Sequence, residues 1–122
     1  MKSQAYRMAL LYDFYGDVLT PRQQEFYDLY YNEDLSLAEI AENNGITRQG
    51  VRDVIVRAEA ILTDLEDKTG LIKRFHKMQQ QFLEVEEAVN AIAQRNDQRW
   101  QDDEVEIQCN RIRGVLDQLK QE

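Results

Sequence analysis

Side chains with the chemistry needed to recognise DNA bases gather in residues 47–57. Arginine donates two parallel hydrogen bonds to a guanine edge, and glutamine pairs in the same way with adenine. At helical spacing Arg48, Gln49 and Arg52 share one outward face, and Thr47 precedes them in the position of a helix cap. The pattern therefore predicts a helix that reads the major groove of duplex DNA. A solvated helix face has the same composition, so both interpretations stay open.

Two further arginines suit contact with phosphates better than contact with bases. Arg57 lies further along the same predicted helix, and Arg22 lies at the start of an earlier one. Phosphate contacts position a protein on the duplex without reading its sequence. The alternative is pairing with nearby acids, because Asp53 precedes Arg57 by four residues, the spacing at which opposite charges meet on a helix.

Residues 36–57 have the spacing of a helix-turn-helix, which would position these side chains. Gly45 stands where the chain must take a positive φ to end the first helix. Gly50 lies inside the second helix, where glycine costs roughly 1 kcal/mol relative to alanine. The positions expected to face inward are Ile40, Ala41, Ile46, Val51 and Val54.

Two more helices are predicted before this motif. An apolar stripe at helical spacing marks the first, and Gly16 is expected to loosen its end. Thr20, Pro21 and Gln23 form a helix-start signal for the second, as Ser36 and Glu39 do for the motif. The stripes are Met8, Leu11, Tyr12, Tyr15 and Leu19, then Phe26, Leu29 and Tyr30. Residues 1–68 are thus predicted to form a unit of about four helices.

Residues 71–120 are predicted to form long amphipathic helices. The preceding helix should stop at Thr69 and Gly70, with Leu71 packing back on Leu65. Two seams at heptad spacing follow: Leu71, Phe75, Met78, Phe82, Val85, Val89 and Ile92, then Val105, Cys109, Ile112, Leu116 and Leu119. The seams either join two copies or fold onto each other within one chain. We expect a homo-oligomer, with a dimer favoured.

Charge limits the affinity of a single copy for DNA. The 122 residues carry a net charge of −8, whereas DNA affinity comes largely from neutralised phosphates. Residues 35–58 are neutral overall, with three basic and three acidic groups. One copy should bind weakly and be sensitive to salt, so two copies in successive major grooves would compensate.

Composition favours an all-α protein without catalytic or metal chemistry. There is one proline, and the single Cys109 allows no internal disulfide and is expected to pack. His76 lacks a second histidine nearby, and no nucleophile set or glycine-rich phosphate loop occurs, so no enzyme, cofactor or metal is expected. Neither a long apolar run nor a signal peptide at the start of the chain is visible, which predicts a cytoplasmic protein without a membrane partner.

Several motifs resemble known families. Leu19-Thr-Pro-Arg-Gln-Gln, Tyr30-Tyr31 and Ser36-Leu-Ala-Glu-Ile-Ala look like the fourth region of bacterial sigma factors. Leu11-Tyr-Asp-Phe-Tyr, Thr47-Arg-Gln-Gly-Val-Arg-Asp and Arg57-Ala-Glu, with the same segments, resemble the YlxM-like helix-turn-helix family of Gram-positive bacteria.

The YlxM-like resemblance covers residues 6 to about 75. It implies an all-helical DNA-binding fold and a regulatory or accessory role near the signal recognition particle pathway. RNA polymerase or components of that particle are then possible partners. The competing hypotheses are a protein-interaction adaptor, whose acidic surface binds a basic partner, and a protein that binds structured RNA.

Overall fold

The computed structural model describes residues 4–121, which form an all-α protein as the sequence predicts. Residues 1–3 lie outside this range. They belong to the segment whose composition predicted that there is no signal peptide. The chain divides into two compact units, with the boundary between Ile72 and Lys73. Each unit is described separately below.

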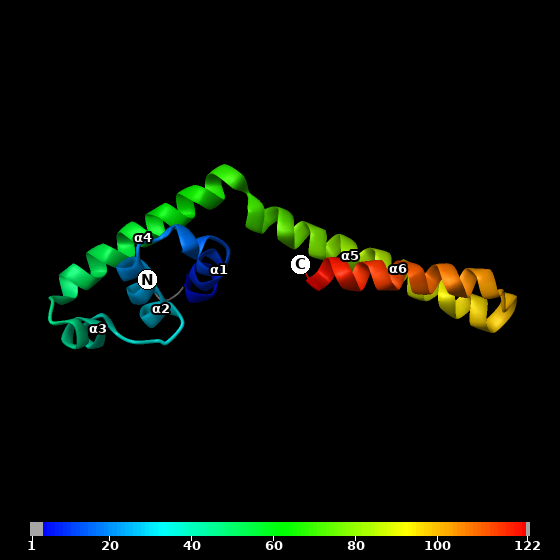
Figure 1. Ribbon diagram of the computed structural model, residues 1–122, viewed down its shortest axis with the longest axis horizontal. Coiled ribbons are helices and arrows are strands. Elements are labelled where there is room, and N and C mark those ends of the chain that lie inside the picture. The colour runs from blue at the N-terminus through cyan, green and yellow to red at the C-terminus, as the bar shows by residue number, and fades with distance from the viewer. Residues whose placement is uncertain (1–3, 122) are drawn as a thin grey trace. The chain divides into compact units, whose positions relative to one another are not determined.

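The first unit contains four α-helices whose starts are set by local capping. They are α1 (Ala5–Tyr15), α2 (Pro21–Tyr31), α3 (Leu37–Asn44) and α4 (Arg48–Thr69), and a 3₁₀ turn, η2 (Gly16–Val18), follows α1 (Figure 1). Both predicted capping boxes are confirmed: Thr20 and Gln23 at α2, and Ser36 and Glu39 at α3, exchange their side-chain and backbone hydrogen bonds. Gly16 ends the α-helical geometry of α1, also as predicted.

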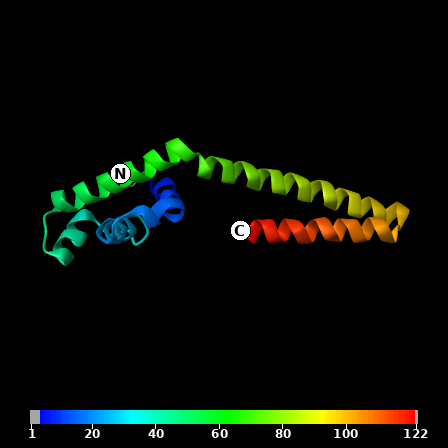
Figure 2. The same cartoon turned by 45° about the horizontal axis from the view of Figure 1, so that its top comes forward.

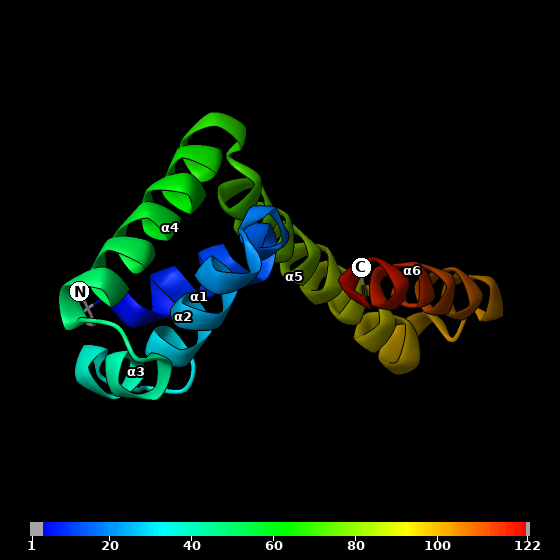
Figure 3. The ribbon, with the colours of Figure 1, turned by 60° about the vertical axis from the view of Figure 1, so that its left-hand side comes forward.

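The core of this unit lies against one side of α4. Figure 3 shows α1 and α2 along that side, with α3 at the N-terminal end of α4. The fully buried side chains from α4 are Val51, Ile55, Ala58 and Leu62, and they meet Leu11, Phe26, Tyr27 and Ile40. Val54 and Leu65 pack at the edge of this core as predicted, whereas Ile61 is exposed.

Buried tyrosines add polar contacts to this core that the apolar pattern does not reveal. The Tyr31 hydroxyl donates a hydrogen bond to the Glu59 carboxylate, and the Tyr27 hydroxyl donates to the Met8 carbonyl at 2.7 Å. Burial is the main cause that raises the pKa of both phenols; Glu59 raises it further, through its hydrogen bond to Tyr31 and through its charge near Tyr27. Both hydroxyls are therefore neutral donors at every physiological pH.

The end of α4 departs from the sequence prediction in one respect. Gly70 takes a left-handed conformation (φ 61°) and closes the helix as expected. However, Leu71 is exposed and Ile72 joins the core in its place. The Glu66 carboxylate explains this choice, because it accepts hydrogen bonds from the Ile72 backbone N–H (3.0 Å) and the Tyr15 hydroxyl (2.6 Å). These bonds hold the first turn of the next helix with Ile72 facing inward.

The second unit is a helical hairpin. It consists of α5 (Leu71–Arg95), whose first two residues precede the unit boundary, a π-helical turn, η3 (Asn96–Trp100), and α6 (Asp103–Gln121). Figure 2 shows α5 and α6 running antiparallel. The buried Asn96 amide closes the turn by donating to the Asp102 carbonyl and accepting from the Asp102 N–H, both at 2.9 Å.

The two heptad seams meet each other within one chain over part of their length. Val89 from α5 and Cys109 and Leu116 from α6 are buried, so Cys109 packs as expected. Arg113 donates to the Asn90 side chain at 2.7 Å, and Lys120 pairs with Glu86. Of the two arrangements that the sequence allows, the intramolecular one thus holds for these residues, whereas the seam residues Ile92, Ile112 and Leu119 remain 45%, 40% and 41% exposed.

Candidate nucleic-acid interface

A sharp turn between α3 and α4 builds the helix-turn-helix. Gly45 has a φ of 65°, and its N–H and that of Ile46 both donate to the Ala41 carbonyl. This conformation suits glycine because a Cβ would strain the backbone there. Ala41 and Ile40 are buried on one side of the turn and Val51 and Ile55 on the other. The faces predicted to point inward are confirmed for these residues.

The side of α4 facing away from this core carries the predicted base-reading residues. Arg48 and Arg52 are exposed and one helical turn apart. Within residues 4–121 neither guanidinium has an ion-pair or hydrogen-bond partner, so both donor forks are available. Gln49 is also exposed, but its amide donates to the Asp53 carboxylate at 2.9 Å. Reading a base with Gln49 would require that bond to break.

The start of α4 is shaped by Thr47 and Gly50 together. The Thr47 hydroxyl accepts a hydrogen bond from the Gly50 N–H at 3.0 Å, which confirms Thr47 as the N-cap. A Cβ at position 50 would lie 3.3 Å from that hydroxyl oxygen and 3.7 Å from the Ile46 side chain. Glycine inside this helix therefore leaves room for the capping hydroxyl, which offsets part of its low helix propensity.

The structure brings Arg22 and Arg57 to one groove, although they are far apart in the sequence. The groove has a volume of about 380 Å³, and its other lining residues are Thr20, Gln23, Gly50, Asp53 and Val54. The Arg22 guanidinium lies over the Phe26 ring at 5.3 Å from its centroid. The Asp53 carboxylate accepts its hydrogen bond from Gln49, so within residues 4–121 it does not form the ion pair with Arg57 that the spacing suggested. The sequence lacked any signal for this groove because it joins α2 to α4.

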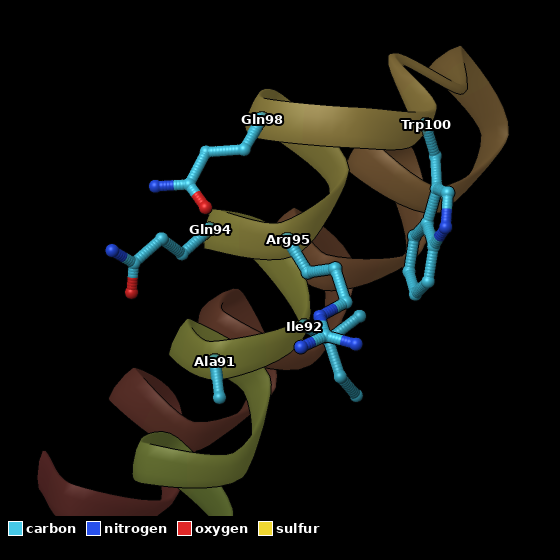
Figure 4. Close-up of a pocket in the computed structure, with 6 residues that line it drawn as sticks. All are labelled: Ala91, Ile92, Gln94, Arg95, Gln98 and Trp100. Atoms are coloured by element: carbon cyan, nitrogen blue, oxygen red, sulfur yellow. The ribbon is translucent and has the colours of Figure 1, made fainter.

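The hairpin unit has a second hollow, at its tip, with different chemistry. It has a volume of about 490 Å³, and Figure 4 shows Trp100 on the same side as Ile92 and Arg95, with Gln94 and Gln98 projecting elsewhere. Trp100 is about half exposed. Among the residues that the structure describes, no cluster of three or more possible metal ligands occurs. Nor does any described helix have the length and apolar character needed to cross a lipid bilayer.

The four-helix unit, its left-handed turn and the exposed outer face of α4 define a helix-turn-helix protein. The chain belongs to the UPF0122 family, described as "Putative helix-turn-helix protein, YlxM / p13 like", whose model matches residues 2–102. This is a family of helix-turn-helix proteins rather than of enzymes. The resemblance to the YlxM-like family is thereby confirmed.

Relatives in the same family come from several bacteria. A UPF0122 protein of Desulforamulus reducens is 50% identical over 80 residues, covering 66% of this chain and 68% of that protein. One from Acetivibrio thermocellus is 47% identical over 89 residues, covering 73% and 76% of the two chains. One from Bacillus mycoides is 44% identical over 96 residues, covering 74% of this chain and 87% of that protein.

Proposed function

We propose that this protein binds duplex DNA through α4 and regulates transcription. The observation that carries the proposal is the pair of exposed guanidiniums, Arg48 and Arg52, which have no partner among residues 4–121 and lie on the outer face of a helix whose inner face is fully buried. The major groove admits an α-helix, and arginine forks match the acceptor pair of guanine. Thr47 and Gln49 lie at the same end of α4 and are the further candidates for contacts with bases.

Contacts with the DNA backbone are proposed for the groove that contains Arg22 and Arg57. Both are exposed arginines, and they lie on different helices around one hollow. Two cations that converge on a hollow beside the reading helix can hold one phosphate group and orient α4. Asp53 in the same groove weakens the local positive potential, which agrees with modest affinity from one copy.

Selection of bound sequences from random duplex DNA, at low and at physiological salt, tests this proposal. Replacing Arg48 and Arg52 together by alanine should abolish the sequence preference, because each bidentate contact is worth roughly 1–3 kcal/mol of discrimination. Arg22→Ala should instead weaken all duplexes similarly and reduce the dependence of affinity on salt.

A matched control separates recognition from overall charge. Arg99 and Arg111 are exposed arginines of the hairpin unit, and their joint replacement by alanine removes the same two charges. This control should keep the sequence preference of the parent. If it loses that preference as the α4 variant does, or if the α4 variant still selects the parent's sequences, then α4 does not read bases.

The second candidate function is that of a protein-interaction adaptor, and the net charge of −8 favours it. A basic partner, such as a surface of RNA polymerase or a component of the signal recognition particle, would then occupy the acidic surface. Absence of duplex binding even at low salt would favour the adaptor over the DNA reader. Binding of structured RNA in competition with DNA would indicate the third hypothesis. A role at bacterial DNA places the protein in the cytoplasm.

A further inference from the structure

The groove between α2 and α4, which contains Arg22 and Arg57, has further polar groups that belong to neither arginine. Its wall on α4 is one stripe of that helix, because the residues lining it are three, one and three positions apart: Gly50, Asp53, Val54 and Arg57. Gly50 has no side chain and Val54 is apolar, so this wall offers one guanidinium and one carboxylate. The opposite wall is the start of α2, and we call the hollow the α2–α4 groove.

The start of α2 adds two hydrogen-bond donors that the helix itself leaves unused. In its capping box the Thr20 hydroxyl oxygen accepts from the Gln23 backbone N–H at 3.2 Å, and the Gln23 side-chain oxygen accepts from the Thr20 backbone N–H at 3.0 Å. These two bonds occupy acceptors, whereas a threonine hydroxyl also has one O–H and a glutamine amide has two N–H groups. Within residues 4–121 these donors have no partner, and both side chains line the α2–α4 groove.

The two arginines supply the remaining donors. The Arg22 guanidinium is held over the ring of Phe26, whose side chain is fully buried. In the described part of the chain, neither Arg22 nor Arg57 has a hydrogen bond or an ion pair with an acid. The groove thus presents a hydroxyl, an amide and two guanidiniums as donors. The Asp53 carboxylate stands against them, and one of its oxygens already accepts from Gln49.

This excess of donors matches an oxyanion, and formal charge decides which kind. Two guanidiniums (+2) and one carboxylate (−1) give the α2–α4 groove a formal charge of +1. Each phosphodiester of a DNA backbone carries one negative charge, whereas a terminal phosphate carries about −1.5 to −2 at pH 7. Asp53 would repel the second charge of a terminal phosphate. The groove therefore matches a phosphodiester better than a phosphomonoester.

We propose that Thr20, Arg22, Gln23 and Arg57 together bind one phosphodiester of the DNA backbone, so that the residues that cap α2 are also DNA ligands. This inference rests on the proposed function. It adds Thr20 and Gln23 to the contacts with DNA and assigns all four side chains to a single phosphate. Because the donors come from both α2 and α4, one bound phosphate fixes the position at which α4 enters the major groove.

Gln23→Glu and Thr20→Asp separate DNA binding from capping. Glutamate keeps the oxygen that caps the helix, as Glu39 does in the matching box of α3, and aspartate is also a good N-cap, but neither ionised side chain has a donor. Each variant should raise the dissociation constant of the duplex that the parent selects by at least about tenfold in fluorescence anisotropy, with parental helicity and melting temperature. Gln80→Glu, an exposed position of α5, is the control for added charge and should change that constant by less than about twofold. Equal effects of the three variants would overturn the proposal.

Duplexes that carry a single methylphosphonate test whether one phosphate is shared, because this group removes the charge of one backbone phosphate. One position should weaken binding of the parent most. On the duplex neutralised there, the losses caused by Arg22→Ala, Gln23→Glu and Arg57→Ala should shrink to about twofold or less, since the partner of each side chain is already altered. General repulsion by an added charge would persist on that duplex. Losses that remain the same at every position would mean that these side chains do not share a phosphate, and the proposal would be wrong.

Small phosphates distinguish a backbone site from a site for a free phosphorylated ligand. At equal ionic strength, dimethyl phosphate should displace the duplex from the parent at least as well as methyl phosphate does. Stronger displacement by methyl phosphate would identify a monoester site and contradict the charge argument. Absence of duplex binding by the parent would overturn the proposed function and this inference with it, whereas duplex binding without a shared phosphate would overturn this inference alone.

Discussion

Removing the Tyr31 hydroxyl tests whether the core depends on its bond to Glu59. The Tyr31 side chain is buried, its ring packs 4.8 Å from that of Tyr27, and its hydroxyl donates to a carboxylate of intermediate exposure. A hydrogen bond to a charged group contributes about 1.5–3 kcal/mol. Because water reaches Glu59 in part, we expect Tyr31→Phe to lower the free energy of unfolding by about 1.5 kcal/mol. At about 4 °C per kcal/mol, the midpoint of thermal unfolding should fall by about 6 °C.

The same substitution has a consequence for stability at alkaline pH. Burial, then the hydrogen bond to Glu59, raise the pKa of Tyr31 above its ordinary value of 10.0. The folded state therefore holds this proton more tightly than the unfolded state. Stability is complete below pH 10 and falls as pH rises above it, by up to about 1.4 kcal/mol per pH unit for each such tyrosine. The pKa values of Tyr27, Tyr12 and Tyr15 are raised as well, so Tyr31→Phe should remove only its own share of that slope.

Urea unfolding followed by circular dichroism at pH 7 and between pH 9.5 and 11 measures both effects. Tyr6→Phe is the control, because Tyr6 is 80% exposed and should change neither value. If Tyr31→Phe is as stable as the parent at pH 7 and loses stability equally fast above pH 10, the phenol is not a buried donor and the reasoning fails.

Three further experiments, two of them with a control substitution, test the motif, the turn and the hairpin. Val51→Asp should unfold the first unit, because an unpaired buried charge lowers the free energy of unfolding by several kcal/mol. The control, Arg48→Ala, should leave the melting temperature within about 2 °C of the parent's. Equal melting temperatures for the two variants would mean that the faces of α4 are misassigned. Gly45→Ala should lower the free energy of unfolding by about 1–2 kcal/mol, because Gly45 has a φ of 65°. The control, Gly114→Ala, fills open space on α6 and should raise that free energy by up to about 1 kcal/mol in the same urea titration. Asn96→Ala should lower the stability of the hairpin by about 1–3 kcal/mol, because it leaves the Asp102 backbone N–H and carbonyl without hydrogen bonds. Amide hydrogen exchange at the start of α6 should become faster. Unchanged exchange would contradict this role of the turn.

Most helix boundaries of the first unit could be predicted because their causes are local, although α1 ends at Tyr15 and leaves Leu19, expected on its stripe, in extended backbone. A capping box joins residues three positions apart, as with Thr20 and Gln23, and a left-handed end requires a glycine at one position, as with Gly45 and Gly70. Helical periodicity likewise placed Val51 inside and Arg48 outside without knowledge of the partner helices. These properties are fixed by residues within one or two helical turns of each other.

Tertiary structure decided the features that join distant segments. The sequence indicated Arg22 and Arg57 separately, but only the packing of α2 on α4 brings them to one groove. Nothing in the periodicity indicated that Glu59 would receive the Tyr31 hydroxyl, or that Ile72 would displace Leu71 from the core through Glu66. The heptad seam has the same spacing whether it meets α6 or a second copy, because both arrangements bury one stripe of one helix. Only the burial of Val89 and Cys109 shows that α6 takes part of the seam.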